Sequence, residues 1–352
     1  MKFILNNFGH FGFILIIGMN SLFLYIINYF FFKKKIFLDN SKLSIHKSFI
    51  NKNQIPLSGG FLILFSIIVL SFFNNYLNLF LSFVLFFIGS MSDIGKLNST
   101  KIRFFLQILI IFLFFIINDF LLIKEIKLEY FDLLLNEYKI ISLLFTCFCI
   151  LILINGSNFI DGTNLQCSGY FFAISLVLIL STIQNDYIID TNKIYIIFLI
   201  LFTFIKFNIF NKSFLGDGGT YLLSFIIGII LIEFFVSNNV SPYFIALLLW
   251  YPAFENFFSI IRRLTHVNKN IDKPDNFHLH HLIFLKIIKS FKNKFLVRNS
   301  IGFTIFLYNI IIFYIGANYI FESKVQIFLI LFSITFYLLL YKLFSTTKKK
   351  IK

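Results

Sequence analysis

Three polar residues recur at intervals of three within one stretch of the chain. Asn155, Asn158 and Asp161 follow an apolar run and are followed by Gly162. At the end of a helix this spacing places the three side chains on one face. Polar residues that continue a membrane-length apolar run are costly against lipid, so we expect them to line a polar pocket. Gly162 permits a tight turn with positive φ after that helix.

A second candidate site is the glycine-rich stretch from Gly216 to Thr220. Here Asp217 stands among three glycines, directly before another apolar run. Glycines let the backbone approach a ligand closely, and free amides at a helix start favour phosphate. A single carboxylate suits Mg²⁺, which usually takes one or two carboxylates together with substrate phosphates. The alternative interpretation is a plain turn with a helix N-cap.

A third candidate site is Asp93, which lies at the end of an apolar run and precedes several cations. Lys96, Lys101 and Arg103 follow it within ten residues. A carboxylate at the mouth of a span, flanked by cations, suits a site that handles phosphate and metal together. An N-cap is the alternative, since Asp is a common capping residue.

Two longer polar segments carry histidines and further cations. Segment 33–56 contains His46 and Lys47 and leads into Pro56 and the pair Gly59-Gly60. These residues are expected either to hold phosphate or to anchor the segment on anionic lipid headgroups.

The longest polar segment, 262–299, contains two adjacent arginines and three clustered histidines. They are Arg262, Arg263, His278, His280 and His281. No Cys or carboxylate completes a transition-metal set here, so imidazole and guanidinium contact with phosphate is the better interpretation.

The elements that position these residues are apolar runs of membrane-spanning length. The 352 residues are 59% hydrophobic and only 13% charged, with a mean hydropathy of +0.88, which excludes a soluble globular protein. Because about 20 helical residues span the hydrocarbon core, we expect about eleven transmembrane helices in one all-α integral membrane domain covering 1–352. The runs are 11–32, 57–73, 79–91, 102–123, 140–154, 169–183, 194–210, 220–236, 241–261, 300–320 and 325–344.

The distribution of cations predicts the orientation of these helices. With the N-terminus outside, 25 of the 31 Lys and Arg fall in cytoplasmic segments, as the positive-inside rule requires, and the C-terminus is cytoplasmic. The polar candidates then gather at the cytoplasmic face. The cytoplasmic loops expected to carry them are 33–56, 92–103, 155–168, 206–219 and 262–299.

The net charge of +15 leaves other function classes to weigh. Nucleic-acid binding is disfavoured, because the basic residues are spread among loops beside membrane spans. A transporter or flippase of lipid-linked sugars is the main rival from another class. Such proteins often place ionisable groups near the bilayer midplane, whereas the acids inside these spans, Glu233 and Glu255, lie toward helix ends.

Taken in order and spacing, the motifs resemble the polyprenyl-phosphate N-acetylhexosamine-1-phosphate transferases. This membrane family, glycosyltransferase family 4, includes WecA and MraY. The NxxNxxDG stretch from Asn155 and the Gly216–Thr220 stretch carry the resemblance, and the HxHH from His278 is closer to the WecA branch. The resemblance implies transfer of a sugar-1-phosphate from a UDP-N-acetylhexosamine to undecaprenyl phosphate in a bacterial inner membrane, which releases UMP. It further implies Mg²⁺, with Mn²⁺ as an alternative ion, membrane lipid as surroundings and no nucleic acid; a homodimer is left open.

The resemblance also implies a role for each motif. Asp93, Asp161 and Asp217 are the expected catalytic carboxylates, with Asp217 and Asp93 as the metal ligands. The expected substrate-binding residues are His46, Lys47, Lys96, Lys101, Arg103, Asn155, Asn158, Asn164, Arg262, Arg263, His278, His280 and His281.

The sequence departs from the family pattern at two places. The family usually has paired Asp after the third span, but here the first is Ser92. Ser is no useful general base; however, a phosphate monoester is largely dianionic at pH 7 and needs no deprotonation. The second departure is Asn164-Leu165, where an Asp-Gly pair is common. A catalytically degenerate member of the family is therefore an alternative.

Overall fold

The computed structural model describes residues 2–39, 54–70, 72–73, 75–184, 187, 191–265, 277–291 and 293–349, with side chains described between residues 12 and 345. Within these ranges the chain is helical, and its one isolated bridge joins Leu38 and Pro56. The elements are α1 (Lys2–Lys34), α2 (Gly59–Val69), α3 (Tyr76–Asp93), α4 (Thr100–Ile117), η2 (Asp119–Leu121), α5 (Glu129–Glu137), α6 (Lys139–Ile160), α7 (Gln166–Gln184), α8 (Thr191–Ile209), α9 (Gly216–Asn238), α10 (Pro242–Leu248), α11 (Trp250–Thr265), α12 (Leu279–Phe291), α13 (Lys294–Asn318) and α14 (Ser323–Lys349).

Among the described residues, nine helices are long and apolar enough to cross a membrane. They are α1, α3, α4, α6, α7, α8, α9, α13 and α14. Each of the eleven predicted runs coincides with a helix except 241–261, which forms the pair α10 and α11 bent by 72°. The run 57–73 forms α2, which has only 11 residues. The fold therefore fits an integral membrane protein, while the predicted number and orientation of spans stay predictions.

The break between α10 and α11 has a local cause in Pro252. Proline lacks the N–H that would bond the carbonyl of Leu248, four residues earlier, and its ring crowds that carbonyl. In the structure the carbonyl of Leu248 accepts a hydrogen bond of 2.7 Å from the Tyr170 hydroxyl instead. The run 241–261 thus becomes two helices without leaving a buried carbonyl unpaired.

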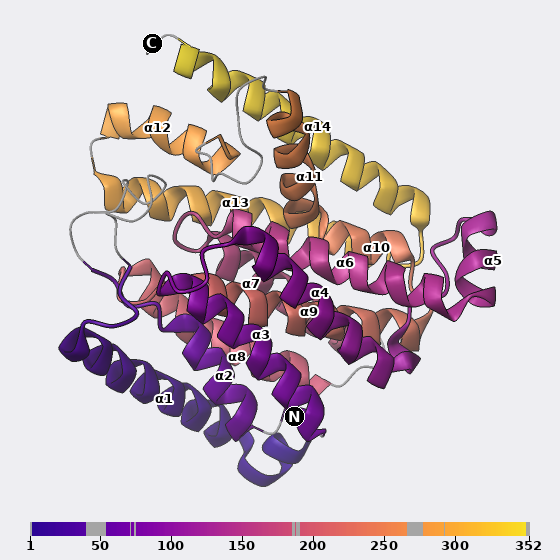
Figure 1. Cartoon of the computed structure of the whole chain (residues 1–352), viewed down its shortest axis with the longest axis horizontal. Coiled ribbons are helices and arrows are strands. Elements are labelled where there is room, and N and C mark those ends of the chain that lie inside the picture. Colours follow the sequence, from indigo (N-terminus) through magenta and orange to yellow (C-terminus); the bar gives the residue numbers. More distant parts are fainter. Residues whose placement is uncertain are drawn as a thin grey trace.

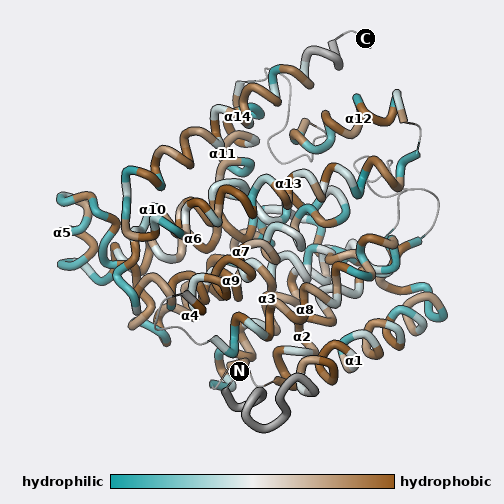
Figure 2. Tube along the Cα trace, turned by 180° about the vertical axis from the view of Figure 1, so that it is seen from behind, coloured by the Kyte–Doolittle hydropathy of each residue, from teal (hydrophilic) through white to brown (hydrophobic). Residues whose placement is uncertain are grey.

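Helix α9 forms the centre of the bundle (Figure 1). In its apolar window 83% of residues are buried inside the protein, against 17% for α14 and 22% for α1, which lie at opposite edges. Along the trace, hydrophobic residues fill the middle of the long helices, and hydrophilic ones gather at α5 and at helix ends (Figure 2). The peripheral helices therefore present apolar faces outward, as a lipid environment requires.

Glycine pairs allow α9 to approach α2 and α3 closely at its first turn. A Cβ added to Gly60 would lie 2.6 Å from the amide nitrogen of Gly219, and one added to Gly89 would lie 2.5 Å from Cα of Gly218. Backbone contacts of this kind exclude any larger side chain. The glycines beside Asp217 were predicted to let backbone approach a ligand. In the structure, Gly218 and Gly219 pack helix against helix.

The predicted cytoplasmic segments come together at one end of the bundle. Gly59 N donates to Phe214 O at 3.0 Å, and the Asn299 amide donates to Ile209 O at 3.1 Å. At the opposite end Lys193 pairs with Glu233, at 2.8 Å. These contacts agree with the alternation of loops expected from the cation bias, while the loop assignments and the end that faces the cytoplasm stay predictions.

Candidate active site

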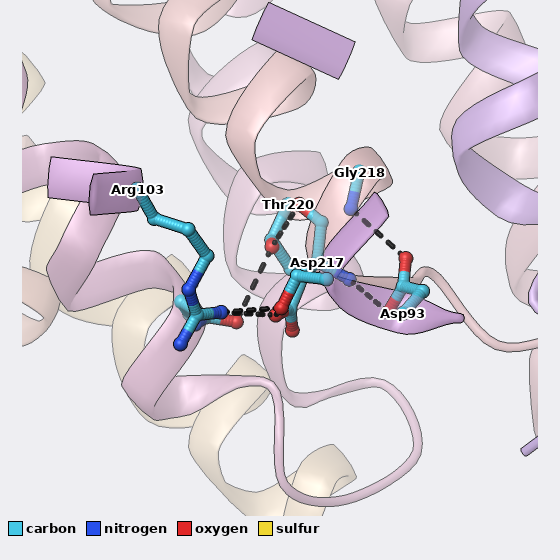
Figure 3. Close-up of polar contacts among 7 residues, drawn as sticks. Asp93, Arg103, Asp217, Gly218 and Thr220 are labelled. Atoms are coloured by element: carbon cyan, nitrogen blue, oxygen red, sulfur yellow. Dashed lines mark hydrogen bonds and ion pairs between the residues drawn. The ribbon is translucent and has the colours of Figure 1, made fainter. Parts of the chain in front are cut away.

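Asp93, the last residue of α3, caps the start of α9. Its Oδ1 accepts a hydrogen bond of 2.9 Å from the amide of Asp217, and its Oδ2 accepts one of 3.1 Å from the amide of Gly218 (Figure 3). A negative charge at a helix N-terminus is favourable, because the first amides lack partners within the helix. Gly216 has a φ of +75°, and a Cβ there would lie 2.7 Å from the Asp93 carboxylate.

This capping bears on two expectations from the sequence. The amides of Asp217 and Gly218 were expected to be free for phosphate, but the Asp93 carboxylate occupies them. Asp93 was expected to hold metal or, alternatively, to be an N-cap. The structure agrees with the N-cap alternative, although the helix that Asp93 caps is α9 and Ser99 caps α4 by accepting from the amide of Ile102; a metal-binding role for Asp93 stays a prediction.

The side chain of Asp217 points toward Arg103 of α4 (Figure 3), and it also contacts Ser92. Its Oδ2 accepts a hydrogen bond of 2.7 Å from Ser92 Oγ and forms an ion pair of 2.9 Å with Arg103 Nη1. Arg103 Nη1 also donates to Ser92 Oγ, so the three groups form a closed triangle. Both charged side chains are only partly buried, with 28% of Asp217 and 17% of Arg103 exposed.

Asn155 and Asn158 lie on one face of α6, as their spacing predicted. Asn155 Nδ2 donates to Gln107 Oε1 of α4 at 3.0 Å. Thr220 of α9 donates to Asn158 Oδ1 across a long 3.5 Å contact. Both asparagines are half-buried, so the end of α6 adds two amides to the polar cluster around Asp217.

Asp161 lies one turn further on, at the C-cap of α6, and has a different environment. It lies within electrostatic reach of Arg298, a buried cation near the start of α13, which also interacts with Asp39. Asp161 therefore belongs to a second cluster of charges, formed with Arg298 and Asp39 and distinct from the cluster around Asp217.

Asn164 is buried in this second cluster, and its expected role in substrate binding stays a prediction. Only 1% of the residue is exposed. Its amide nitrogen donates to Asn211 Oδ1 at 2.8 Å and to Asn299 Oδ1 at 2.9 Å, while its oxygen accepts from Arg298 at 3.2 Å. Every polar atom of the side chain is thus committed to the protein.

The three histidines of the HxHH motif are also buried, between α6, α7, α11 and α14. His278 Nδ1 lies 2.8 Å from Oε1 of the fully buried Glu255, and Tyr337 donates to the other Glu255 oxygen at 2.5 Å. His281 packs against His280, with ring centroids 4.1 Å apart. In this structure the histidines tie helices together, and contact with diphosphate or sugar would need them to be uncovered.

His280 is the most enclosed of the three. Its Nδ1 lies 3.0 Å from Gln166 Nε2, its Nε2 packs against Gly162, and 0% of the residue is exposed. Burial, and then the neighbouring His281 and His278, hold the pKa of His280 well below its ordinary value. The imidazole is therefore neutral at physiological pH.

The two arginines of α11 differ in exposure. Arg262 is buried and donates to Phe277 O at 2.9 Å, whereas Arg263 is half-buried and stacks over Phe159 at 5.4 Å. Phe159 also lies 5.4 Å from the His278 ring. The end of α6 therefore contacts the Asp217 cluster through its asparagines, and it contacts the histidine cluster through Phe159 and through Gly162 in the turn that follows.

The remaining predicted cations give less to the site. Lys96 is exposed on the connection from α3 to α4, and Lys101 is exposed in the first turn of α4. His46 and Lys47 lie outside the described residues, so their expected contact with phosphate stays a prediction.

A comparison with protein families gives a match over the part of the chain that contains the Asp217 cluster. Residues 75–235 match the family model described as Glycosyl transferase family 4. The match supports membership in glycosyltransferase family 4. It runs from the start of α3 nearly to the end of α9, just under half of the chain. A comparison with curated proteins finds no match.

The segment matched to glycosyltransferase family 4 contains one carboxylate that fits a bound Mg²⁺. Asp217 Oδ1 has no donor among the described residues and the side chain is partly exposed, whereas both Asp93 oxygens face α9 amides. No group of three or more His, Cys, Asp or Glu able to hold a metal occurs in the described ranges. Mg²⁺ often takes only one or two carboxylates and completes its shell with water and phosphate, so Asp217 alone fits such a site.

Several site residues were missed in the sequence. Gln107 is one turn from Arg103 on α4, and this i,i+4 spacing within an apolar run is a signal for a shared polar face. Ser92 was noted only as a lost carboxylate, and Arg298 was not singled out within segment 262–299. Tyr337 gives no signal, because its hydroxyl finds Glu255 only through packing.

Proposed function

We propose that the protein transfers N-acetylhexosamine-1-phosphate from a UDP-sugar to undecaprenyl phosphate and thereby begins a cell-envelope glycan. The family match suggests a polyprenyl-phosphate sugar-phosphate transferase in general, and members of the family are phospho-sugar transferases. The membrane-length helices support a multi-pass membrane protein. The specific sugar, lipid and pathway belong to this proposal.

The observation that carries the proposal is the partly exposed Asp217–Arg103 pair at the start of the central helix α9. It combines a carboxylate for a cation with a guanidinium for phosphate, at a bundle end where half-buried amides from Asn155 and Asn158 converge. An acceptor phosphate on a lipid and a diphosphate donor from solution both need such a mixture of charges at the membrane surface.

The reaction needs positioning and charge neutralisation more than proton transfer. An oxygen of the lipid phosphate forms a bond to the β-phosphorus of the UDP-sugar, and the bond from that phosphorus to the bridging oxygen breaks, so that UMP leaves. Because the acceptor is already ionised near pH 7, no general base is required. Arg103 offsets charge on phosphate, and Asn155 and Asn158 orient the donor. When held by Asp217, Mg²⁺ supplies Lewis-acid neutralisation of the diphosphate.

The proposed location is the bacterial inner membrane with the site on the cytoplasmic face. The Lys and Arg bias supports this orientation, since 25 of the 31 Lys and Arg fall in the segments predicted to share the end that carries Asp217. UDP-sugars are cytoplasmic, and the phosphate of the lipid lies at that surface.

The test is an assay of purified full-length protein with undecaprenyl phosphate, Mg²⁺ and a panel of UDP-N-acetylhexosamines. We expect UMP release and a sugar-diphosphate lipid detected by mass spectrometry with at least one sugar. Asp217→Asn should reduce the rate by at least about a hundredfold, as loss of one preorganised electrostatic group typically does. Asp119→Asn, an exposed carboxylate paired with Lys139 at the opposite end, is the matched control and should keep full activity.

Three outcomes would reject the proposal. Undiminished UMP release from Asp217→Asn would show that the Asp217 cluster takes no part in the reaction. Movement of a lipid-linked sugar across vesicles without UMP formation would favour the transporter. No turnover with any UDP-sugar would favour a degenerate member.

A further inference from the structure

The triangle of Ser92, Arg103 and Asp217 has a defined direction of hydrogen bonding. A hydroxyl has one proton to donate, and Ser92 Oγ lies 2.7 Å from Asp217 Oδ2, which can only accept when ionised. The Ser92 Oγ atom also accepts a hydrogen bond from Arg103 Nη1, which can only donate. Ser92 therefore holds the guanidinium against the carboxylate, and both directions are fixed by chemistry.

Arg103 is a strong counter-ion in this position. Its Nη1 forms the 2.9 Å ion pair with Asp217, and both side chains are more than two-thirds buried, which weakens screening by solvent. The neutral Ser92 adds no charge, so the three side chains together are neutral. Asp217 thus has its negative charge balanced before any metal binds.

Each charged partner nevertheless keeps one free side. Among the described residues no group accepts a hydrogen bond from Arg103 Nε, which is buried, and every hydrogen bond of the guanidinium uses Nη1. Asp217 uses only Oδ2, so its Oδ1 is open to a cation. A divalent cation at Oδ1 would stand within a few ångströms of the guanidinium and be repelled by it.

We propose that Arg103, held in place by Ser92, is a built-in counter-ion that competes with divalent cations for Asp217 and sets how much cation the site needs. This inference rests on the proposed function for the identity of the cation. Its physical content is that removing the guanidinium, or adding a second negative charge at position 92, tightens cation binding at Asp217.

The experiment measures Mn²⁺ binding to the purified full-length protein in detergent by electron paramagnetic resonance, without substrate. Asp217→Asn defines background binding. Arg103→Met removes the positive charge while keeping an unbranched side chain, and Ser92→Asp adds a carboxylate. We expect each variant to lower the Kd for Mn²⁺ at least about tenfold. The interaction energy between the cation and one unit charge a few ångströms away in a partly buried site exceeds about 1.4 kcal/mol, which corresponds to a factor of ten in Kd.

Matched variants separate charge from shape. Ser92→Asn has the size of Asp without its charge and should leave the Kd within about threefold of the wild type. Ser99→Asp adds the same charge at an exposed capping position of α4, where Asp is a good cap, and should also leave it unchanged. Arg103→Lys keeps the positive charge and should leave the Kd for Mn²⁺ as high as in the wild type. Thermal unfolding of each variant confirms that it is folded.

The outcomes are decisive without turnover. An unchanged or higher Kd in both Arg103→Met and Ser92→Asp would overturn the inference, as would equal tightening in Ser92→Asn. Arg103→Gln replaces Arg103→Met if the latter fails to fold. Absence of UMP release by the wild type would reject the proposed function but would leave this binding result standing.

Discussion

Asp93 holds Asp217 by its backbone, and the two residues are 124 positions apart. The 2.9 Å hydrogen bond from the Asp217 amide to Asp93 Oδ1 fixes the end of α3 on the start of α9. The side chain of Asp217 is then free to turn toward Arg103. One carboxylate therefore positions the other, and the two Asp residues have different tasks although both were predicted as metal ligands.

Asp93→Asn should destabilise the protein and reduce its activity. Asn removes the negative charge and places an NH₂ group against one of the two amides, which costs about 1–2 kcal/mol of unfolding free energy for a lost helix cap. The unfolding temperature in detergent and the rate of UMP release should both fall, whereas Mn²⁺ binding at Asp217 should persist. Abolished binding in a folded Asp93→Asn protein would instead identify Asp93 as a ligand.

Gly89→Ala should disrupt the contact between α3 and α9. The added methyl group would meet the backbone of Gly218 at 2.5 Å, and backbone cannot move aside like a side-chain tip. Overpacking of this kind costs about 1–3 kcal/mol. Gly18→Ala in α1 is the control, because a Cβ there meets nothing within 4 Å and Ala favours helix. Equal unfolding temperatures for the two variants would contradict the close approach.

Asn164→Ala should lower stability without changing the KM for the UDP-sugar. The substitution leaves the buried Arg298 and the half-buried Asn211 and Asn299 without this partner, at a cost of about 1–3 kcal/mol. Asn136→Ala, an exposed amide at the other end of the bundle, should change stability by less than about 0.5 kcal/mol. A many-fold rise in KM with unchanged stability would restore Asn164 as a substrate contact.

His280 should make the protein less stable in mild acid. Its pKa is lowered in the folded state, first by burial, from an ordinary value of 6.5. The unfolded chain therefore binds the proton more tightly, and stability falls as the pH drops from about 7 through 6.5 and below. Each pH unit below 6.5 costs up to about 1.4 kcal/mol for this one proton.

His280→Asn tests this dependence, because Asn keeps an acceptor for Gln166 and does not titrate. Unfolding temperatures at pH 7.5, 6.5 and 5.5 should fall less steeply in the variant than in the wild type. If the unfolding temperature falls equally steeply with pH in the variant and the wild type, the acid sensitivity comes from other groups. Protonation of His280 would then not contribute to the pH dependence of stability.

The sequence by itself determined the helices and the end at which polar groups gather. Apolar runs of spanning length and the i,i+3 spacing of Asn155 and Asn158 are local patterns, and local patterns are sufficient for helix formation in lipid, where every backbone group must bond within its own segment. The cation bias likewise predicts which loops share an end of the bundle, because neighbouring spans must alternate in direction.

Only the tertiary structure decided which polar group meets which. Asp93 caps α9 because glycine pairs bring α3 within backbone contact of α9. Asn164 and His280 are buried because α12 and α13 cover the turn after α6, and nothing within the motifs encodes that cover. A side chain's partner depends on which helices become neighbours, and that choice is made by packing over the whole bundle, far beyond the reach of a local spacing.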